Sequence, residues 1–316
     1  LFGSASLQHL FKCAKVGLAG NPPHEIAEEL RDISEQVRLQ RHLDTRGIVL
    51  HPNQMQVALA GNAVGFGVAE SGVFLERVRD LGSLFFRTAE RIAKRPFRER
   101  GRRAGKIVSA VELFVVAPRA GSFTVSLQLG RQAQLGLEGF GFAEGVIQEF
   151  LDCMQLFQAG DGKKLDERIA DEAYLVNFLG LARNISPDGD SIQSVAFSAG
   201  GRLRSREVLL TRPRHEAIGV SRSVALGPPA ENVAIQGVLK FADAMKESEN
   251  EIGLVDAKSH RHRILVPPGL MDDIVRPLWD SEVYVLGSKR GNLIYLTEIQ
   301  PVVGLPPPPD EKDPDK

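Results

Sequence analysis

The sequence is poor in the residues that most often reveal a function. Its 316 residues include one tryptophan, three tyrosines and two cysteines, Cys13 and Cys153. Two cysteines exclude a zinc site built from four cysteines, and they allow at most one disulfide bond. Because both lie among apolar or helix-forming residues, we expect two unpaired thiols in a reducing compartment.

Net charge and long apolar runs are lacking as well. The formal net charge is −1 at pH 7, so an attraction to nucleic acid or to an acidic membrane must come from local clusters of charge. No apolar run approaches the roughly 18 residues that a helix needs to span a bilayer. The apolar start, residues 1–20, has no basic leader and is interrupted by polar side chains. We therefore expect a cytoplasmic protein that makes no membrane contact.

What is present is the composition of an ordinary globular protein, with 43% hydrophobic and 25% charged residues. Apolar periodicity and turn residues divide the chain into three folded regions and a proline-rich acidic tail. The predicted class is α+β, in which mixed α/β N-terminal and middle regions precede a small β-barrel. The predicted boundaries are 1–107, 108–225 and 231–303, with a disordered tail at 304–316. The sequence leaves open whether the first two regions share one sheet.

The first region is expected to be mixed. A helical stretch over 4–41, broken at 21–23, precedes short strands and a long helix over 73–93 with an apolar stripe every three to four residues. The predicted strands are 47–50, 54–60 and 64–68.

The middle region is predicted to contain a helical pair between two hairpins. Residues 107–118 are β-branched and apolar on both faces, which is typical of a buried strand. The remaining elements are a partner strand at 122–130, helices at 143–158 and 164–184, and a second hairpin at 191–199 and 202–211. Residues 212–230 are rich in Pro, Gly, Arg and Ser and are expected to be a linker.

The last region has the clearest architecture. Five short strands are expected, with a helix at 270–278 between the third and the fourth, and Gly237 lies where a tight barrel needs a bulge. The strands are predicted at 233–242, 251–255, 261–267, 282–286 and 292–299. This β-β-β-α-β-β order resembles that of the OB-fold superfamily over about 70 residues, although small SH3-like barrels have similar strand patterns.

The resemblance implies that oligonucleotides or oligosaccharides bind at strands two and three and at the adjoining loops. Tyr284 and Tyr295 would be stacking platforms, although aromatic residues inside strands usually pack in the core. Acidic residues keep the barrel from being strongly basic, and many such barrels only bind proteins. The implied contacts are Lys240, His260, Arg261, His262, Arg263, Lys289 and Arg290.

The strongest charge anomaly is the segment 87–106, in which seven arginines and two lysines face only Glu90 and Glu99. A net charge of +7 over twenty residues is enough to bind phosphates and release counterions. A solvated helix end that pairs with acidic neighbours such as Glu25 is the alternative. The cations are Arg87, Arg91, Lys94, Arg95, Arg98, Arg100, Arg102, Arg103 and Lys106.

A second cluster consists of six arginines: Arg202, Arg204, Arg206, Arg212, Arg214 and Arg222. The first three project from one face of a strand because they are spaced two apart. The cluster strengthens the case for an acidic partner if it lies on the same side of the molecule as segment 87–106.

No catalytic or metal-binding motif rises above these signals. His260 and His262 could share a strand face, but a metal would need a third ligand, and the sequence near Asp161 lacks the glycine spacing of a phosphate loop. The carboxylates of Asp166, Asp171 and Asp188 could form a metal-dependent nuclease centre, and a solvated helix face and a turn account for them equally well. We therefore predict no catalytic residues, no metal and no cofactor.

The function predicted from these observations is that of a non-enzymatic binding or adaptor subunit in a bacterial multi-protein system. Its arginine-rich surfaces would contact DNA, RNA or an acidic protein partner. Two alternatives stay open. One is a purely structural component of a larger assembly or a homo-oligomer, and the other is a hydrolase with an unrecognised acidic site.

Overall fold

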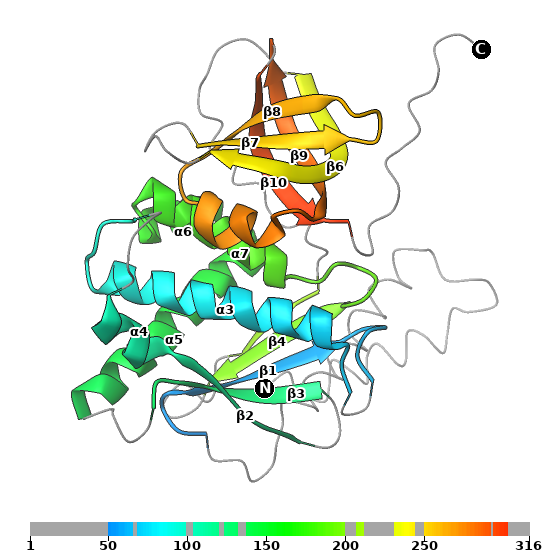
Figure 1. The fold of residues 1–316 in the computed structure, drawn as a ribbon. Coiled ribbons are helices and arrows are strands. Elements are labelled where there is room, and N and C mark those ends of the chain that lie inside the picture. Colours follow the sequence, from blue (N-terminus) through cyan, green and yellow to red (C-terminus); the bar gives the residue numbers. More distant parts are fainter. Residues whose placement is uncertain are drawn as a thin grey trace, which may run out of the picture. The chain divides into compact units, whose positions relative to one another are not determined.

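A computed structural model of the chain describes residues 50–65, 68–98, 104–119, 123–131, 137–199, 207–211, 231–243, 250–291 and 293–302. All of them belong to one unit, Arg46–Lys316. The predictions for the helical stretch 4–41, for Cys13, for the linker 212–230 and for the tail 304–316 lie outside the described residues. The described chain contains both helices and sheets, so the predicted α+β class is confirmed (Figure 1). Among the described residues, no helix has both the length and the apolar character needed to cross a membrane.

One antiparallel sheet joins strands from both of the first two predicted regions. Its order is β2-β3-β1-β4-β5, so the earliest strand lies at the centre. Val57 on β1 pairs with Val125 on β3 and with Phe197 on β4, which places three apolar side chains side by side on one face. The strands are β1 (Gln54–Ala60), β2 (Leu113–Arg119), β3 (Phe123–Leu129), β4 (Ser194–Ala199) and β5 (Glu207–Leu210).

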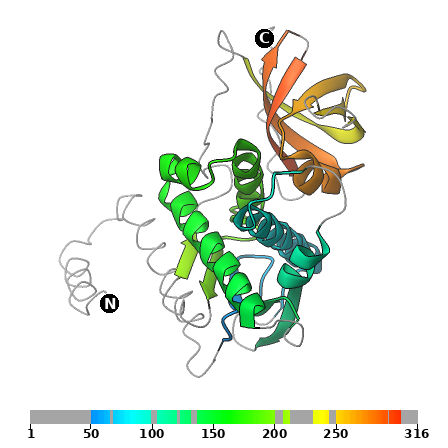
Figure 2. The ribbon, with the colours of Figure 1, turned by 90° about the vertical axis from the view of Figure 1, so that its left-hand side faces the viewer.

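Two long helices, α3 (Ser71–Ile92) and α5 (Leu137–Ala159), cover this face of the sheet (Figures 1 and 2). Phe85 of α3 lies 4.9 Å from Phe150 of α5, measured between ring centroids, and Phe150 lies 5.3 Å from Phe197 of β4. All three rings are fully buried. This cluster of tilted and edge-to-face aromatic rings lies in the core between the helices and the sheet.

The prediction of one strand over 107–118 is wrong in its first half. Residues Gly105–Val111 form a short helix, α4, and the strand β2 begins only at Leu113. Ile107 and Val111, four residues apart, are the buried side chains of this helix. A short apolar run fits a buried strand and a buried helical turn equally well, so the sequence pattern alone does not distinguish them.

The helix predicted over 164–184 is two helices, α6 (Gly162–Arg168) and α7 (Glu172–Ile185). Each begins at an aspartate whose side chain accepts a hydrogen bond from a backbone N–H three residues later. Asp161 accepts from Lys164, and Asp171 accepts from Tyr174. Because such a capping carboxylate satisfies a backbone donor at a helix start, Asp171 begins a new helix at this position.

The C-terminal strands form a closed barrel in the order β10-β8-β7-β6-β9. All neighbouring pairs are antiparallel except β8 and β10, which run parallel. A short helical segment, η2 (Met271–Val275) followed by η3 (Arg276–Leu278), connects β8 to β9. The strands are β6 (Glu231–Asp243), β7 (Asn250–Asp256), β8 (Arg261–Val266), β9 (Glu282–Arg290) and β10 (Leu293–Pro301).

The segment η2 also packs against α7. A Cβ atom added to Gly180 of α7 would lie 2.3 Å from Cδ1 of Ile274, so a larger residue there would require the Ile274 side chain to move. Gly269, just before η2, has a φ of +97°, and a Cβ atom there would lie 2.5 Å from the carbonyl oxygen of Ala173. Two glycines from distant parts of the chain therefore bring the barrel segment onto this helix.

Candidate functional site

The basic segment begins inside the protein, because Arg87 on α3 is only 6% exposed. Its Nε donates to Oδ2 of Asp273 at 2.7 Å, and its Nη1 donates to Oε2 of Glu90 at 3.0 Å. Burial by itself lowers the pKa of Arg87, but the charges and hydrogen bonds of Asp273 and Glu90 outweigh it and raise the pKa above its ordinary value. Arg87 was expected at a binding surface, yet it is part of the core because its charge is neutralised there.

Arg91, one turn further along α3, is also committed to an internal network. Its Nη2 donates to Oε1 of Glu149 at 2.7 Å, and Arg168 donates to both carboxylate oxygens of the same glutamate. Burial raises the pKa of Glu149, but hydrogen bonds from Arg168 and Arg91 outweigh it and hold the pKa below its ordinary value. Arg168 also donates to Asp152 at 2.6 Å. The network therefore neutralises two arginines with two carboxylates.

The chain that follows α3 is anchored through its main chain. Nη1 of Arg87 donates to the carbonyl oxygen of Arg98 at 2.9 Å, and the hydroxyl of Tyr174 donates to the carbonyl oxygen of Arg95 at 3.1 Å. Between these two bonds, the ring of Phe97 meets Tyr174 edge-on at 5.0 Å. The guanidinium of Arg87 lies 4.4 Å from the Phe97 ring centroid. The side chains of residues 95 and 98 take no part in these anchoring bonds.

The anchor leaves a group of cations at the surface, since Lys94, Arg95 and Arg98 are all exposed. Lys106 is exposed at the start of α4. We call residues 94–106 the basic loop. Its sequence contains seven cations and one carboxylate, Glu99, which leaves a net charge of +6. Of the predicted contact residues in this segment, Arg100, Arg102 and Arg103 lie outside the described residues.

The other predicted cations that the structure describes lie on the barrel strands β6, β8 and β9. Arg202, Arg204 and Arg206 lie outside the described residues. On the barrel, Lys240 pairs with Asp280, and Arg263 makes two hydrogen bonds of 2.6 Å to Glu251. Arg261 and Lys289 are exposed, and the guanidinium of Arg290 lies 5.5 Å from the ring centroid of Tyr295.

The barrel is not basic as a whole. Residues 231–302 contain eight lysines and arginines and eleven aspartates and glutamates, a difference of −3. Asp256 accepts hydrogen bonds from the backbone N–H groups of Lys258 and His260, and its Oδ2 lies 3.0 Å from Nε2 of His262. The hydrogen bond with His262, followed by those backbone bonds, outweighs burial and lowers the pKa of Asp256 to about 2. The sequence of the basic loop therefore has the higher density of positive charge.

Two exposed aromatic side chains on the barrel were missed by sequence reasoning. Phe241 on β6 and Trp279 after η3 are each 51% exposed. Tyr284 and Tyr295, which the sequence favoured as stacking platforms, are half-buried within strands. Gly253 is the residue from which the exposed Phe241 could have been predicted. A glycine within a strand often marks a place where another group lies close to the backbone. That group is Phe241, whose Cβ lies 3.0 Å from the position of a Cβ atom added to Gly253.

The acidic residues considered for catalysis have structural partners. Asp171 caps α7, and Oδ2 of Asp188 accepts a hydrogen bond from Nη2 of Arg77 at 3.1 Å. Asp188 also accepts from the backbone N–H of Ile192 at 2.8 Å, which closes the turn before β4. Within the described ranges, no group of three or more His, Cys, Asp or Glu side chains could hold a metal ion.

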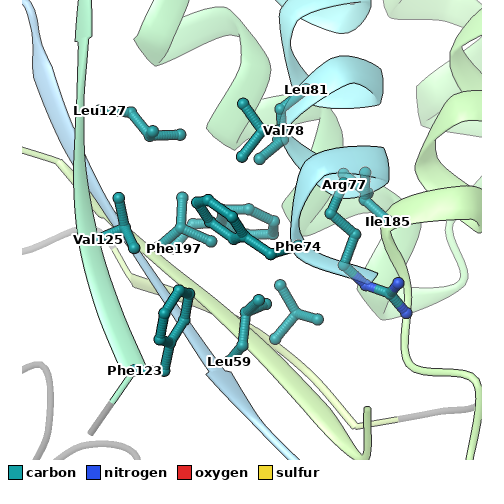
Figure 3. A pocket seen from close by; sticks show the side chains of 12 residues that line it. Leu59, Phe74, Arg77, Val78, Leu81, Phe123, Val125, Leu127, Ile185 and Phe197 are labelled. Carbon is teal, nitrogen blue, oxygen red and sulfur yellow. The ribbon is translucent and has the colours of Figure 1, made fainter. Parts of the chain in front are cut away.

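One apolar cavity lies between α3 and the sheet (Figure 3). Its volume is about 10 Å³, which is at most the space for one water molecule. Figure 3 shows the rings of Phe74, Phe123 and Phe197 gathered around it, while the guanidinium of Arg77 points away from them. A gap of this size in apolar packing is not a ligand site.

Cys153 also belongs to the core. Burial is the main reason that its pKa is raised to about 12, even though Arg91 lies close to the thiol. A thiol that stays protonated at neutral pH is a poor nucleophile.

Comparison with known proteins adds no identification to this geometry. No protein-family model matches the chain, and no curated protein matches it at a significant level.

Proposed function

We propose that the protein is a non-enzymatic binding subunit that contacts nucleic acid through the basic loop. The observation that supports this proposal is the anchor beneath the loop. Arg87 and Tyr174 bind the main chain at residues 98 and 95, and Phe97 packs between them. The side chains of Lys94, Arg95 and Arg98 are thereby presented to solvent.

The charge of the basic loop suits the phosphate backbone of a nucleic acid. Binding Z phosphates with lysine and arginine releases condensed counterions, and the logarithm of affinity then falls with the logarithm of salt concentration by about 0.7 Z for a single strand. A net charge of +6 over thirteen residues allows several such contacts. Contacts of this kind carry no sequence information, which fits a subunit that positions other components on a nucleic acid.

The barrel is part of the proposal as an OB-like module. Counted from β6, the strand order around the barrel is 1-2-3-5-4, the third and fifth strands are parallel, and the helical segment lies between the third and fourth. These features support the OB-like assignment, in which strands two and three are the usual binding face. Arg261 and Arg263 lie on that third strand, and they would supply a second, weaker contact.

A structural role in an assembly is the second candidate, and a feature of β2 favours it. This strand lies at one edge of the five-stranded sheet, and Val115 and Val116 are 49% and 37% exposed. Exposed apolar residues on an edge strand favour pairing with another chain. If this candidate is correct, changing both valines to lysine shifts the protein to a smaller species in light scattering.

Salt-dependent binding of fluorescently labelled single-stranded DNA and RNA tests the main proposal. The variant Arg95→Ala/Arg98→Ala keeps the anchor, because Arg87 and Tyr174 bind backbone carbonyls. It should lower the salt slope by about 1.4, as expected for two lost phosphate contacts. The control is Lys163→Ala/Lys164→Ala, which removes two cations from α6, outside the basic loop.

Absence of binding to DNA and RNA at low salt would falsify the nucleic-acid proposal. An acidic protein that co-purifies with the wild type but not with the Arg95→Ala/Arg98→Ala variant would instead identify the acidic partner as a protein.

A further inference from the structure

The two exposed aromatic side chains of the barrel belong to two segments that are hydrogen-bonded to each other. Phe241 follows a bulge in β6, where the pairing with β7 shifts between Leu239 and Phe241. At this bulge, both Lys240 and Phe241 are exposed. Phe241 lies against Gly253 of β7, where there is no side chain to cover it. The bulge therefore exposes an aromatic ring on the outside of the barrel.

Trp279 is held beside this bulge by its neighbours in the chain. The backbone N–H of Asp280 donates to the carbonyl oxygen of Leu239 at 3.0 Å, and the N–H of Leu239 donates to the carbonyl oxygen of Ser281 at 3.1 Å. The side chain of Asp280 pairs with Lys240. Trp279 directly precedes Asp280, and Phe241 directly follows Lys240, so each aromatic residue is the chain neighbour of one member of this ion pair. We call Phe241, Lys240 and Trp279 the aromatic patch.

The described chain ends at the same end of the barrel. The last strand, β10, pairs Pro301 with Val283 of β9, and the backbone N–H of Val302 donates to the carbonyl oxygen of Glu282 at 3.0 Å. On its other side, β9 pairs Glu282 with Val238 of β6, just before the bulge. The chain thus leaves the barrel one strand away from β6, next to the segment that carries Trp279.

The sequence that follows this exit contains the run Pro306–Pro309, four consecutive prolines followed by Asp310 and Glu311. Residues 303–305 separate the run from the last described residue. Four steps from Val302 to Pro306 span about 12 Å at roughly 3.1 Å per residue in a polyproline II conformation. Val238 lies about 10 Å from Val302 across two strand spacings of roughly 4.8 Å, and Phe241 lies about 10 Å further along β6 at roughly 3.3 Å per residue. The direct distance to Phe241 is therefore about 14 Å, which Pro307, five steps from Val302, covers at about 16 Å. The run can therefore reach the aromatic patch within the same chain.

We propose that the aromatic patch binds the Pro306–Pro309 run of its own chain. Proline-rich segments bind between exposed aromatic rings, because the preformed polyproline II helix loses little conformational entropy on binding. Asp310 and Glu311, directly after the prolines, would compete with Asp280 for Lys240, because that ion pair is exposed to solvent. This occupant differs from the ligand of the basic loop, so the two proposals involve separate surfaces and separate residues.

The test uses Trp279, which is the only tryptophan of the chain and reports directly on the patch. In the tail variant, Pro306, Pro307, Pro308 and Pro309 are all changed to serine. We expect its fluorescence emission to shift to longer wavelength and its acrylamide quenching constant to rise about twofold. The control is Pro314→Ser, which changes a proline outside the run and should leave both quantities as in the wild type.

Two further measurements identify the occupant. A synthetic peptide of residues 303–312, added to the tail variant, should return the emission and the quenching constant toward the wild-type values. The four proline-to-serine changes should also be made in a Phe241→Ala protein. There they should change the emission wavelength and the quenching constant of Trp279 by less than half as much as they do in the wild type.

Equal emission and equal quenching in the wild type and the tail variant overturn the proposal. A difference that appears only as the protein concentration rises overturns the intrachain form and assigns the patch to a second copy. Quenching of Trp279 by single-stranded DNA, with no effect of the tail variant, also overturns it and assigns the patch to nucleic acid. None of these variants changes the basic loop. A negative result here therefore does not contradict the proposed function, which the salt-dependent binding experiment tests separately.

Discussion

The helix-covered sheet and the barrel differ in how they treat charged side chains. In the former, Arg77 and Arg87 are almost fully buried and pair with carboxylates far away in the sequence. On the barrel, the side chains of Lys240 and Arg263 are 55% and 67% exposed, and each pairs with a carboxylate on the barrel's own surface. The barrel also leaves Phe241 and Trp279 exposed, whereas the aromatic rings between α3, α5 and β4 are buried.

This difference distinguishes charged side chains that stabilise the fold from those that remain able to bind a ligand. A buried arginine is held by partners that cannot be removed without leaving an uncompensated charge, so it contributes to the fold and not to binding. An exposed ion pair contributes little to stability, and its members can change partners when a ligand arrives. The basic loop joins the two kinds, because buried Arg87 holds the backbone from which Arg95 and Arg98 extend.

The largest effect is expected from Asp273→Ala, which removes the barrel-side partner of Arg87. Loss of one member of a buried ion pair costs about 3–5 kcal/mol, and we expect about 3 kcal/mol because Glu90 continues to pair with Arg87. Denaturant unfolding measures the change. Lys240→Ala, which removes an exposed pair, should cost less than about 1 kcal/mol. Equal losses of unfolding free energy in Asp273→Ala and Lys240→Ala would contradict the distinction between a stabilising buried pair and a weak exposed pair.

A smaller effect is expected where α7 meets η2. Gly180→Ala places a methyl group against the buried side chain of Ile274, and overpacking of this kind costs about 1–3 kcal/mol. Adding Ile274→Val to the Gly180→Ala variant removes Cδ1, the atom that the new methyl group would contact. The double variant should therefore recover part of the lost unfolding free energy. Gly82→Ala on α3 meets no atom within 4 Å and should stabilise the protein by about 0.5–1 kcal/mol. Thermal and denaturant unfolding compare the three variants.

Tyr174→Phe should have a still smaller effect, concentrated at the basic loop. The change removes one hydrogen bond, to the carbonyl oxygen of Arg95, and should cost about 1 kcal/mol of unfolding free energy. Trypsin should then cleave after Lys94 and Arg98 several-fold faster, because the backbone there is held less tightly. Tyr284→Phe, the same change on the barrel, is the control. Cleavage at the same rate in both variants would contradict the anchoring role of Tyr174.

The smallest effect concerns the exposed turn between β7 and β8. The pKa of Asp256 is lowered to about 2, first by its hydrogen bond with His262. Because the folded pKa lies below the ordinary value of 3.8, ionised Asp256 favours the folded state. This contribution is fully present above pH 3.8 and is lost as the pH falls through about 2.

His262→Ala should move the Asp256 titration toward higher pH, which carboxyl carbon chemical shifts can follow. The titration of Asp161, whose pKa is lowered by Lys164, serves as the internal control. An unchanged Asp256 midpoint would show that the backbone donors alone lower its pKa.

Local patterns in the sequence predicted most of the elements. The five barrel strands lie within a few residues of their predicted positions, because turn residues and alternating apolar residues mark strand ends locally. The helix predicted over 270–278 is instead a π-helical turn followed by a 3-10 turn. Pro277 prevents an α-helix from continuing through this residue, since proline cannot donate the backbone hydrogen bond that it needs.

The candidate site was predicted only in part. The sequence identified the dense positive segment, and Lys94, Arg95 and Arg98 are exposed. It did not separate them from Arg87, because the partner that buries Arg87 is Asp273, 186 residues away. Binding by the basic loop itself stays a prediction.

Charge density, apolar periodicity and turn chemistry are properties of neighbouring residues, and from them the sequence by itself determined the α+β class and the position of the basic segment. Burial depends on residues that meet only after folding. The tertiary structure therefore decided that Arg87 is a core residue, that residues 105–111 are helical, and that Phe241 and Trp279 face solvent. An arginine or an aromatic ring has the same local sequence signal whether or not a distant carboxylate or apolar surface covers it.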